Sequence, residues 1–304
     1  MDNDRLTSAT TLRVPASSAN LGPGFDSLGI ALQVYLTCRF SPAARLTIRC
    51  EGRDASLISN AEDNLIWQTA LSIAARAGRT LPPADLVITN EIPLGKGLGS
   101  SAAAITAGVI IASCLLDLGW KAGRILDEAA RIEGHPDNVA ACVLGSVVVS
   151  AEEPGGTTRA IRLEMPPNFC VAVVVPNFAL PTKEARAVLP DSYSRADATF
   201  NIQRAALLTA ALATGDVSAF PAALADRLHQ PFRASLVPGL AEILRLRAPG
   251  LLGCTLSGAG PGVLVFYERG SENVCDLVRQ TFAMSGCTTE VISSGVSPTG
   301  YEFL

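Results

Sequence analysis

The sequence predicts an α+β fold in two halves, and three observations support this prediction. Apolar runs typical of strands alternate with helical stripes over the first half of the chain. Late in the chain a strand, a helix and a strand follow one another, an order typical of a split βαβ, ferredoxin-like half. Breakers cluster between the halves over residues 152–168, where EEPGGTT and MPPN occur. We therefore expect a first domain over residues 1–160 and a second over residues 161–304.

In the first half, each element is predicted from its hydrophobic period and its flanking breakers. The helix over residues 64–77 has an apolar stripe from Leu65 to Ala74, and Gly78 stands where a C′ glycine would end it. The predicted strands are residues 12–14, 30–40, 46–50, 86–91 and 145–150. The predicted helices are residues 64–77, 100–118 (closed by Gly119) and 122–132.

In the second half, alanine-leucine stretches favour helices and short apolar runs favour strands. The predicted strands are residues 170–176, 253–255, 263–267 and 289–293. The predicted helices are residues 198–213, 220–228, 240–246 and 273–285. With 304 residues, 48 % of them hydrophobic, the chain can bury one large core or two moderate ones.

Composition excludes several classes of partner. The formal charge of −4 is spread along the chain with no basic run, so nucleic acid is not an expected partner. The N-terminal MDNDRLTSAT is acidic and polar, and the eight cysteines form no C-x-x-C pair, which favours the cytoplasm and buried free thiols. Residues 97–116 carry no charge but are rich in small residues, so we expect a buried helix there and no contact with a membrane.

The segment 93–103, PLGKGLGSSAA, lies between a predicted strand and an uncharged predicted helix. Glycines at 95, 97 and 99 would let backbone N–H groups surround an anion, and the helix would direct its positive end at the same point. A tight turn would need one glycine rather than three. The loop matches neither the P-loop pattern nor G-x-G-x-x-G, yet it predicts a polyphosphate site.

Residues 93–102 resemble the second motif of the GHMP kinases, P-x-x-x-G-L-G-S-S-A. Residues 15–29, PASSANLGPGFDSLG, resemble the first motif in the form found in the homoserine kinase branch, and LSGAGPG at 256–262 resembles the third. Three further segments are similar to signatures of that branch: EGHPDN at 133–138, ALPTKEAR at 179–186 and HQPFR at 229–233.

The resemblance, which covers nearly the whole chain, implies the GHMP kinase fold. In that fold an N-terminal ATP-binding half, similar to domain 2 of ribosomal protein S5, precedes a ferredoxin-like C-terminal half. It also implies a cytoplasmic transferase of threonine biosynthesis that phosphorylates the side-chain hydroxyl of L-homoserine with ATP and Mg²⁺. An exposed sheet edge in this fold could support a homodimer.

The resemblance also implies the residues of the site. Ser101 and Glu133 are the implied Mg²⁺ ligands, in keeping with the preference of Mg²⁺ for hard oxygen. The implied substrate-binding residues are Asn20, Asp26, His135, Asp137, Asn138, Arg186 and Arg233. Among them, carboxylates would accept from the ammonium group and the two arginines would bind the carboxylate. The implied ATP-binding residues are Asn64, Pro93, Leu94, Gly95, Lys96, Gly97, Leu98, Gly99, Ser100, Ser101, Ala102, Ala103, Gly258 and Gly260.

Some of these residues have other readings. Asn64 is equally suited to cap the helix that follows it, and Glu133 alone could be a solvated acid at a helix end. Mevalonate kinases carry an aspartate where this chain has Asn138, and an asparagine cannot act as a general base. Catalysis would then rest on alignment and electrostatic stabilisation, with Asn138 and Asp26 as the catalytic candidates and Asp26 the one acid to test as a base.

Two alternatives to homoserine phosphorylation remain at this point. The first is another GHMP kinase, acting on a sugar or a mevalonate-type acid. The second is a binding protein that has the family's shape but no activity, although the retained Ser101, Glu133 and glycine loop argue against it. His229, four residues before Arg233, is interpreted as structural.

Overall fold

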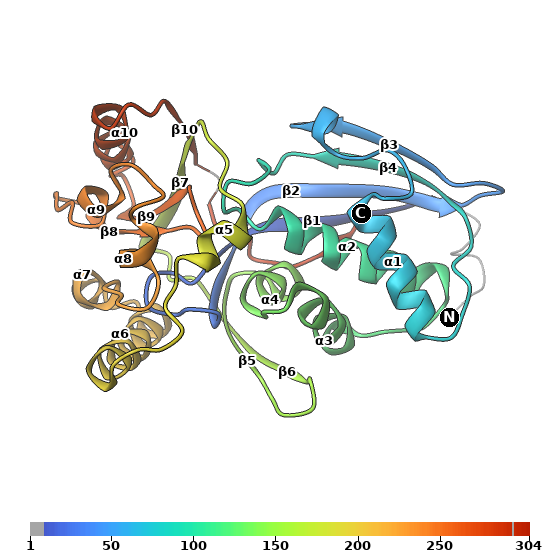
Figure 1. Ribbon diagram of the computed structural model, residues 1–304, viewed down its shortest axis with the longest axis horizontal. Helices are drawn as coiled ribbons and strands as arrows, with labels where there is room; N and C mark the ends of the chain where they lie inside the picture. The colour runs from blue at the N-terminus through green and yellow to red at the C-terminus, as the bar shows by residue number, and fades with distance from the viewer. Residues whose placement is uncertain (1–8, 294) are drawn as a thin grey trace.

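The computed structural model describes residues 9–293 and 295–304, and it shows two halves lying side by side along the long axis of the molecule (Figure 1). Each half is built on its own sheet, one of seven strands and one of four. Residues 1–8, part of the N-terminal segment on which the prediction of the cytoplasm rests, lie outside the described residues.

The larger sheet belongs mainly to the first half of the chain. Its strands are β1 (Thr10–Ala19), β2 (Leu28–Pro42), β3 (Thr47–Gly52), β4 (Ala84–Asn90), β5 (Val147–Glu152), β6 (Thr158–Leu163) and β11 (Glu302–Phe303). They follow the order β11-β1-β2-β4-β3, with β5 joining β2 to β6. β3 runs parallel to β4, and the other pairs are antiparallel.

Helices cover one face of this sheet (Figure 1). They are α1 (Leu65–Arg76), α2 (Ser100–Leu115), α3 (Ala122–Glu133) and α4 (Asp137–Leu144). α2 and α4 pack on β1 and β2, and α1 and α3 pack on α2. α2 is surrounded on all sides, which explains why it carries no charge. Gly108 lies where α2 meets α1, so close to the Ile66 carbonyl that a Cβ would not fit.

The second half confirms the predicted ferredoxin-like arrangement. Its strands are β7 (Phe169–Pro176), β8 (Leu251–Leu256), β9 (Val263–Glu268) and β10 (Thr289–Ile292), in the antiparallel order β10-β7-β9-β8. That order, with helices between β7 and β8 and between β9 and β10, is the β-α-β-β-α-β topology. The helices are α5 (Thr182–Ala187), α6 (Arg195–Thr214), α7 (Phe220–Ala223), α8 (Gln230–Arg233), α9 (Leu240–Ile243) and α10 (Val274–Met284).

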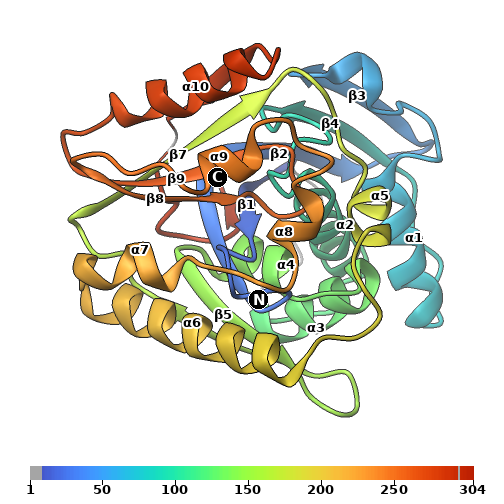
Figure 2. The same ribbon diagram turned by 60° about the vertical axis from the view of Figure 1, so that its left-hand side comes forward.

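The four-stranded sheet is covered on both faces, as Figure 2 shows with α10 on one side and α6 and α7 on the other. Alternate residues of β7 enter two cores: Phe169 and Val171 join the core that continues into the first half, whereas Ala172 and Val174 join a smaller core with α9 and α10. β7 therefore reads as a continuous apolar run because both of its faces are buried.

The predicted elements exist, but several bounds differ and some short elements were missed. The strand predicted over 12–14 extends through the whole of β1, and the helix predicted over 100–118 ends at Leu115. The helix predicted over 220–228 ends at Ala223, because the Asp226 carboxylate accepts the N–H groups of Leu228, His229 and Gln230 and closes a turn instead. The missed elements are α4, α5, α8, β6 and β11, together with two short 3₁₀ helices at Ala55–Leu57 and Val217–Ala219.

β6 was missed because half of its residues are exposed and its sequence shows no apolar alternation. It forms a hairpin with β5, so the predicted boundary at 160/161 falls inside a strand of the first sheet. The division into two domains at that point stays a prediction.

All eight cysteines are free, as predicted, and the predicted burial is confirmed for five of them, whereas the other three are half-buried. The uncharged window over 97–116 is the glycine loop followed by the buried α2. Within the described ranges, no helix has the length and hydropathy needed to cross a membrane.

Candidate active site

A pocket lies between the two halves and gathers most of the predicted site residues. It is lined by Asn20, Asp26, Gly95, Gly97, Gly99, Ser100, Ser101, Glu133, His135, Asp137, Asn138, Leu180, Thr182, Arg186, Arg233, Gly258, Ala259 and Gly260. Segments far apart in sequence therefore meet here. Leu180, Thr182 and Ala259 were not predicted, although each lies within a segment that the sequence had singled out.

The glycine loop turns its carbonyl groups outward and leaves its N–H groups free. The carbonyls of Gly95, Lys96, Gly97 and Leu98 accept from Leu180 N, Gly262 N, Ser257 Oγ and Ser17 N at 3.0, 3.1, 2.7 and 3.0 Å. The N–H groups of residues 95–101 donate to no acceptor among the described residues. Successive free N–H groups at the start of α2 form a concave site for an anion.

The glycines of this loop are needed for packing as well as for conformation. Gly95, Gly97 and Gly99 have φ of 67°, 81° and 67°. A Cβ at Gly97 would lie less than 3.0 Å from the Ser257 carbonyl oxygen, and one at Gly99 less than 3.0 Å from Ser17 Oγ. Real Cβ atoms essentially never come that close to another heavy atom. Side chains at 97 and 99 would therefore point into neighbouring protein, which is a further reason for glycine there.

Ser101 and Glu133 place two oxygens beside the loop. Ser101, in the first turn of α2, donates from Oγ to Oε2 of Glu133, the last residue of α3, at 3.1 Å. Burial raises the pKa of Glu133, while His135 and the Ser101 hydroxyl oppose the shift. A hydroxyl and a carboxylate that already face each other beside free N–H groups fit the hard oxygen ligands of a phosphate-bound Mg²⁺.

His135 lies between two carboxylates. Its Nδ1 is 2.7 Å from Asp137 Oδ1, and its Nε2 is 4.0 Å from Glu133 Oε1. Burial alone would lower the pKa of His135, but the hydrogen bond and charge of Asp137, together with Glu133, outweigh it and raise the pKa. The Asp137 side chain is 2 % exposed and also accepts the N–H of Asn138 at 2.7 Å.

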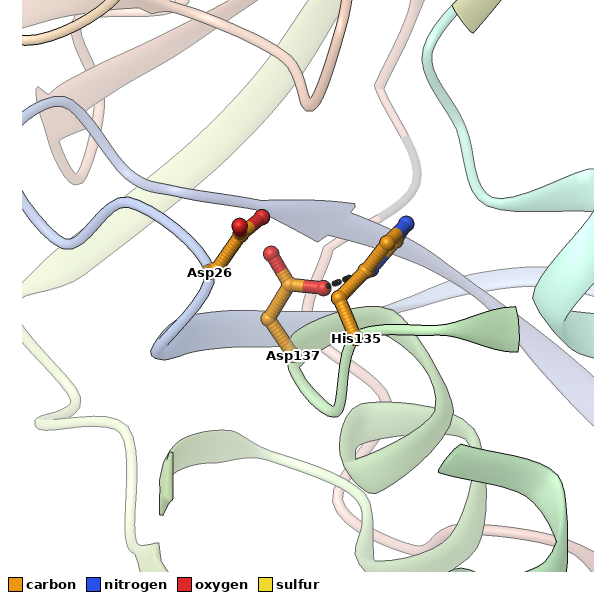
Figure 3. A group of neighbouring side chains, drawn as sticks. All are labelled: Asp26, His135 and Asp137. Carbon is orange, nitrogen blue, oxygen red and sulfur yellow. Dashed lines mark hydrogen bonds and ion pairs between the residues drawn. The ribbon is translucent and has the colours of Figure 1, made fainter. Parts of the chain in front are cut away.

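The carboxylates of Asp26 and Asp137 lie in one cluster with His135, drawn in Figure 3. One ligand atom from each lies within 4.8 Å of the others. Asn20 holds Asp26 in place, because Asn20 Oδ1 accepts the Asp26 N–H at 3.0 Å and Asn20 Nδ2 donates to the Gly258 carbonyl at 2.9 Å. The cluster suits a cation with several donors, such as an ammonium group.

Two arginines reach the same pocket and differ in their partners. Arg186 of α5 forms a bidentate ion pair with Asp26, with Nη2–Oδ1 at 2.7 Å and Nη1–Oδ2 at 3.2 Å. Arg233 of α8 is 1 % exposed, donates to the carbonyls of Ala185 (2.9 Å) and Gly258 (3.2 Å), and pairs with no carboxylate among the described residues. Burial, and then Arg186, lower the pKa of Arg233 to about 10. A buried cation at a pocket wall without an anion favours an anionic ligand.

Asn138 is oriented by its neighbour on β1. Ser17 Oγ donates to Asn138 Oδ1 at 2.9 Å. The Asn138 amide nitrogen donates to no acceptor among the described residues, and Asn138 lines the pocket. This side chain can donate to a substrate oxygen but cannot take up a proton.

Seven predicted ATP-binding residues do not line the pocket: Asn64, Pro93, Leu94, Lys96, Leu98, Ala102 and Ala103. Asn64 caps α1, since its Oδ1 accepts from Ile66 N at 3.0 Å and Trp67 N at 3.4 Å. Its Nδ2 donates to the Ser59 carbonyl at 2.6 Å. The capping interpretation is confirmed, whereas a contact with the nucleotide base stays a prediction.

The loop residues in that group contact the surrounding protein instead of the pocket. Lys96 Nζ donates to the Pro176 carbonyl at the end of β7 at 2.9 Å, which ties the loop to the second half. The Leu94 N–H donates to Asp54 Oδ2 at 3.0 Å, and Leu98, Ala102 and Ala103 are buried.

Comparison with known proteins matches both halves of the chain. Residues 64–146 match the model of the GHMP kinases N terminal domain, and residues 208–283 match that of the GHMP kinases C terminal. The homoserine kinase of Solibacter usitatus is 66 % identical over 291 residues, which cover 96 % of each chain. The homoserine kinase of Deinococcus radiodurans is 48 % identical over 263 residues, 86 % of this chain and 85 % of that protein. The crystal structure of homoserine kinase from Cytophaga hutchinsonii matches with a TM-score of 0.83 and 25 % identity, covering all of both chains.

Proposed function

The chain belongs to the homoserine kinases of the GHMP kinase family and phosphorylates the side-chain hydroxyl of homoserine with ATP; on this premise we propose which residues carry each part of the reaction. The predicted GHMP kinase fold is confirmed. The geometry of the glycine loop carries the proposal for ATP, because four of its carbonyls are already hydrogen-bonded to protein donors, its N–H groups have no acceptor among the described residues, and its glycines line the pocket.

In this proposal the β- and γ-phosphates of ATP lie against the N–H groups of residues 95–101 and the N-terminus of α2. The loop is held by bonds to the second half of the chain, so its donors are preset before the nucleotide enters. Ser101 Oγ and Glu133 would hold Mg²⁺ on the phosphates. When bound, Mg²⁺ offsets the negative charge that builds on the transferring group and the leaving oxygen.

The proposed substrate pocket has opposite charges for the two ends of an α-amino acid. Asp26 and Asp137 would accept from the ammonium group, with Asn20 holding the backbone of Asp26 and His135 holding the carboxylate of Asp137. Arg233 would bind the substrate carboxylate, because it is the buried cation without an anionic partner.

Arg186 would be the second arginine at the substrate carboxylate. It is paired with Asp26 in this structure. When the amino acid binds, this ion pair would be replaced by two others, one between Arg186 and the substrate carboxylate and one between Asp26 and the substrate ammonium group.

The proposed transfer is direct. The homoserine hydroxyl oxygen forms a bond to the γ-phosphorus as the bond to the bridging oxygen of ADP breaks, and the hydroxyl proton is released. Asn138 Nδ2, oriented by Ser17, would align the hydroxyl, and a loose transition state needs little activation of the attacking oxygen. Asp26 is the acid to test as an acceptor of that proton.

A coupled assay of ADP release tests the proposal. With homoserine, mevalonate, galactose and shikimate offered in turn, we expect turnover with homoserine and background rates with the other three. Turnover with mevalonate or galactose in place of homoserine would refute the substrate assignment. Tight ATP binding without turnover of any of the four would instead favour a non-catalytic role.

The setting of the enzyme completes the proposal. The eight free thiols support a cytoplasmic location, and the charge of −4 without a basic run supports the absence of nucleic-acid partners. β3 lies at an edge of the larger sheet and is the surface through which a homodimer could form. Sedimentation at several concentrations tests that state.

A further inference from the structure

The hydrogen-bond partners that hold the Arg233 side chain are all uncharged groups. Its guanidinium is buried, and among the described residues its hydrogen-bond partners are the Ala185 and Gly258 carbonyls and the ring of His229. An arginine side chain is long and flexible. Fixed partners must therefore hold it if the unbonded edge of its guanidinium is to point toward a ligand in a single direction. Two uncharged aromatic residues add to the restraint that the two carbonyls supply.

His229 is one of them. Its Nε2 lies 2.7 Å from the Gly22 carbonyl, which can only accept, so Nε2 carries the proton. Nδ1 is then the free acceptor of the neutral ring, and Arg233 Nη1 donates to it at 3.1 Å. Burial lowers the pKa of His229 despite the nearby Asp226, which keeps the ring neutral and able to accept.

Phe25 is the other. Its ring stacks on His229 with a centroid distance of 5.3 Å and an interplanar angle of 26°. The guanidinium carbons of Arg186 and of Arg233 each lie 5.6 Å from the centroid of the Phe25 ring. The two cations repel each other, and the negative face of an aromatic ring is attractive to both.

We propose that Phe25 and His229 form a neutral aromatic pair that sets the direction of Arg233 and holds it beside Arg186, so that the site for the substrate carboxylate exists before homoserine binds. Neither residue lines the pocket, so both act as positioning residues. This inference deepens the proposed function and rests on it, because it requires Arg233 to bind the carboxylate of homoserine.

The test compares two phenylalanine-to-leucine variants. Phe25→Leu keeps an apolar side chain of similar size but removes the π face. Phe220→Leu makes the same change at a ring that packs on Phe169 and Phe266 in the core and, among the described residues, has no arginine over its face. For Phe25→Leu we expect the KM for homoserine to rise about five- to thirtyfold, the effect of losing a desolvated cation–π contact. The KM for ATP should change by less than about twofold in both variants.

His229 gives a second, independent pair of variants. Asn at this position keeps an acceptor where Nδ1 stands, whereas Gln keeps a donor where Nε2 stands and loses the acceptor. We therefore expect His229→Gln to raise the KM for homoserine and His229→Asn to restore much of the loss. A merely structural role would not produce this order.

An unchanged KM for homoserine in Phe25→Leu overturns the inference, and so does an equal rise in the KM values for homoserine and ATP. Arg233→Ala separates this inference from the proposed function. If Arg233→Ala leaves the KM for homoserine unchanged, the carboxylate role of Arg233 is wrong. If Arg233→Ala raises it while Phe25→Leu does not, only the positioning role is wrong. On the Arg233→Ala background, Phe25→Leu should raise the KM for homoserine by a smaller factor than it does in the wild type, because only its contact with Arg186 remains to be lost.

Discussion

Replacing Gly99 by alanine should disturb the fold and the pocket together. Gly99 is the N-cap of α2 and has a left-handed φ of 67°. The added Cβ would press on Ser17 Oγ and would lie 3.0 Å from Asn138 Oδ1 and from the Ser17 carbonyl. Because Ser17 Oγ holds the Asn138 amide, a displaced Ser17 moves a side chain of the pocket.

The expected loss of stability has two parts. Alanine in the left-handed conformation costs about 1–2 kcal/mol. Forcing an atom into a packed site costs about 1–3 kcal/mol more. Gly119 offers a matched control, since its φ is 64° and a Cβ there would meet nothing within 4 Å. Gly119→Ala therefore measures the conformational part alone, and the difference between the two variants measures the steric part.

Chemical unfolding and homoserine-dependent ADP release should be measured for Gly99→Ala, Gly119→Ala, Ser17→Ala and the double variant Ser17→Ala/Gly99→Ala. Ser17→Ala alone should cost about 1 kcal/mol, the value of a lost hydrogen bond. In the Gly99→Ala background it should cost less or stabilise, because it removes the oxygen that the new Cβ meets. Activity should fall in Gly99→Ala and stay near that of the wild type in Gly119→Ala. Equal stability of the two glycine variants, or additive effects of the Ser17 and Gly99 changes, would refute the reasoning.

Three other variants test the site and the fold. Glu133→Gln should lose activity steeply and regain part of it with excess Mg²⁺, whereas Asn138→Ala should keep the wild-type Mg²⁺ dependence; a normal Mg²⁺ affinity in Glu133→Gln would contradict the ligand role. Arg233→Ala should lower kcat/KM for homoserine more than tenfold, since a missing charged pair costs about 2–5 kcal/mol, and should leave the KM for ATP nearly unchanged. The carboxylate-free analogue 3-aminopropanol should react poorly with the wild type and lose little further in Arg233→Ala; simple addition of the two losses would show that Arg233 does not face the carboxylate. Glu128, 2 % exposed, pairs with Arg76, Arg124 and Arg131, and Glu128→Gln should cost about 1–3 kcal/mol at neutral pH. Burial raises the folded-state pKa of Glu128, but the three arginines outweigh burial and lower it. The stability that Glu128 contributes is therefore complete above its unfolded-state pKa and is lost as the pH falls through its folded-state pKa. Unfolding curves of the wild type and Glu128→Gln that stay equally far apart in acid would count against this prediction.

The positions of the main helices and strands follow from short stretches of sequence. Asn64 and Gly134 mark the start of α1 and the end of α3 through capping, which depends on a few neighbouring residues. The alternation in β4 and the continuous apolar run of β7 report burial on one face or on two. The elements that were missed, such as β6 and α8, are short or exposed, so they are held by their partners rather than by a local pattern.

For the site, the sequence by itself determined which residue types are available, through the glycine loop and the motifs that resemble the GHMP kinases. Only the tertiary structure decided their partners: Arg186 pairs with Asp26, 160 residues away, Lys96 reaches the end of β7, and Arg233 remains buried without an anion. It also decided the orientation of the loop, because the donors that turn the carbonyls of residues 95–98 outward come from β1, from Leu180 two residues before α5 and from the turn between β8 and β9. The physical reason is that periodicity and capping are local, whereas an ion pair or a hydrogen bond across the pocket depends on how segments far apart in the sequence pack together.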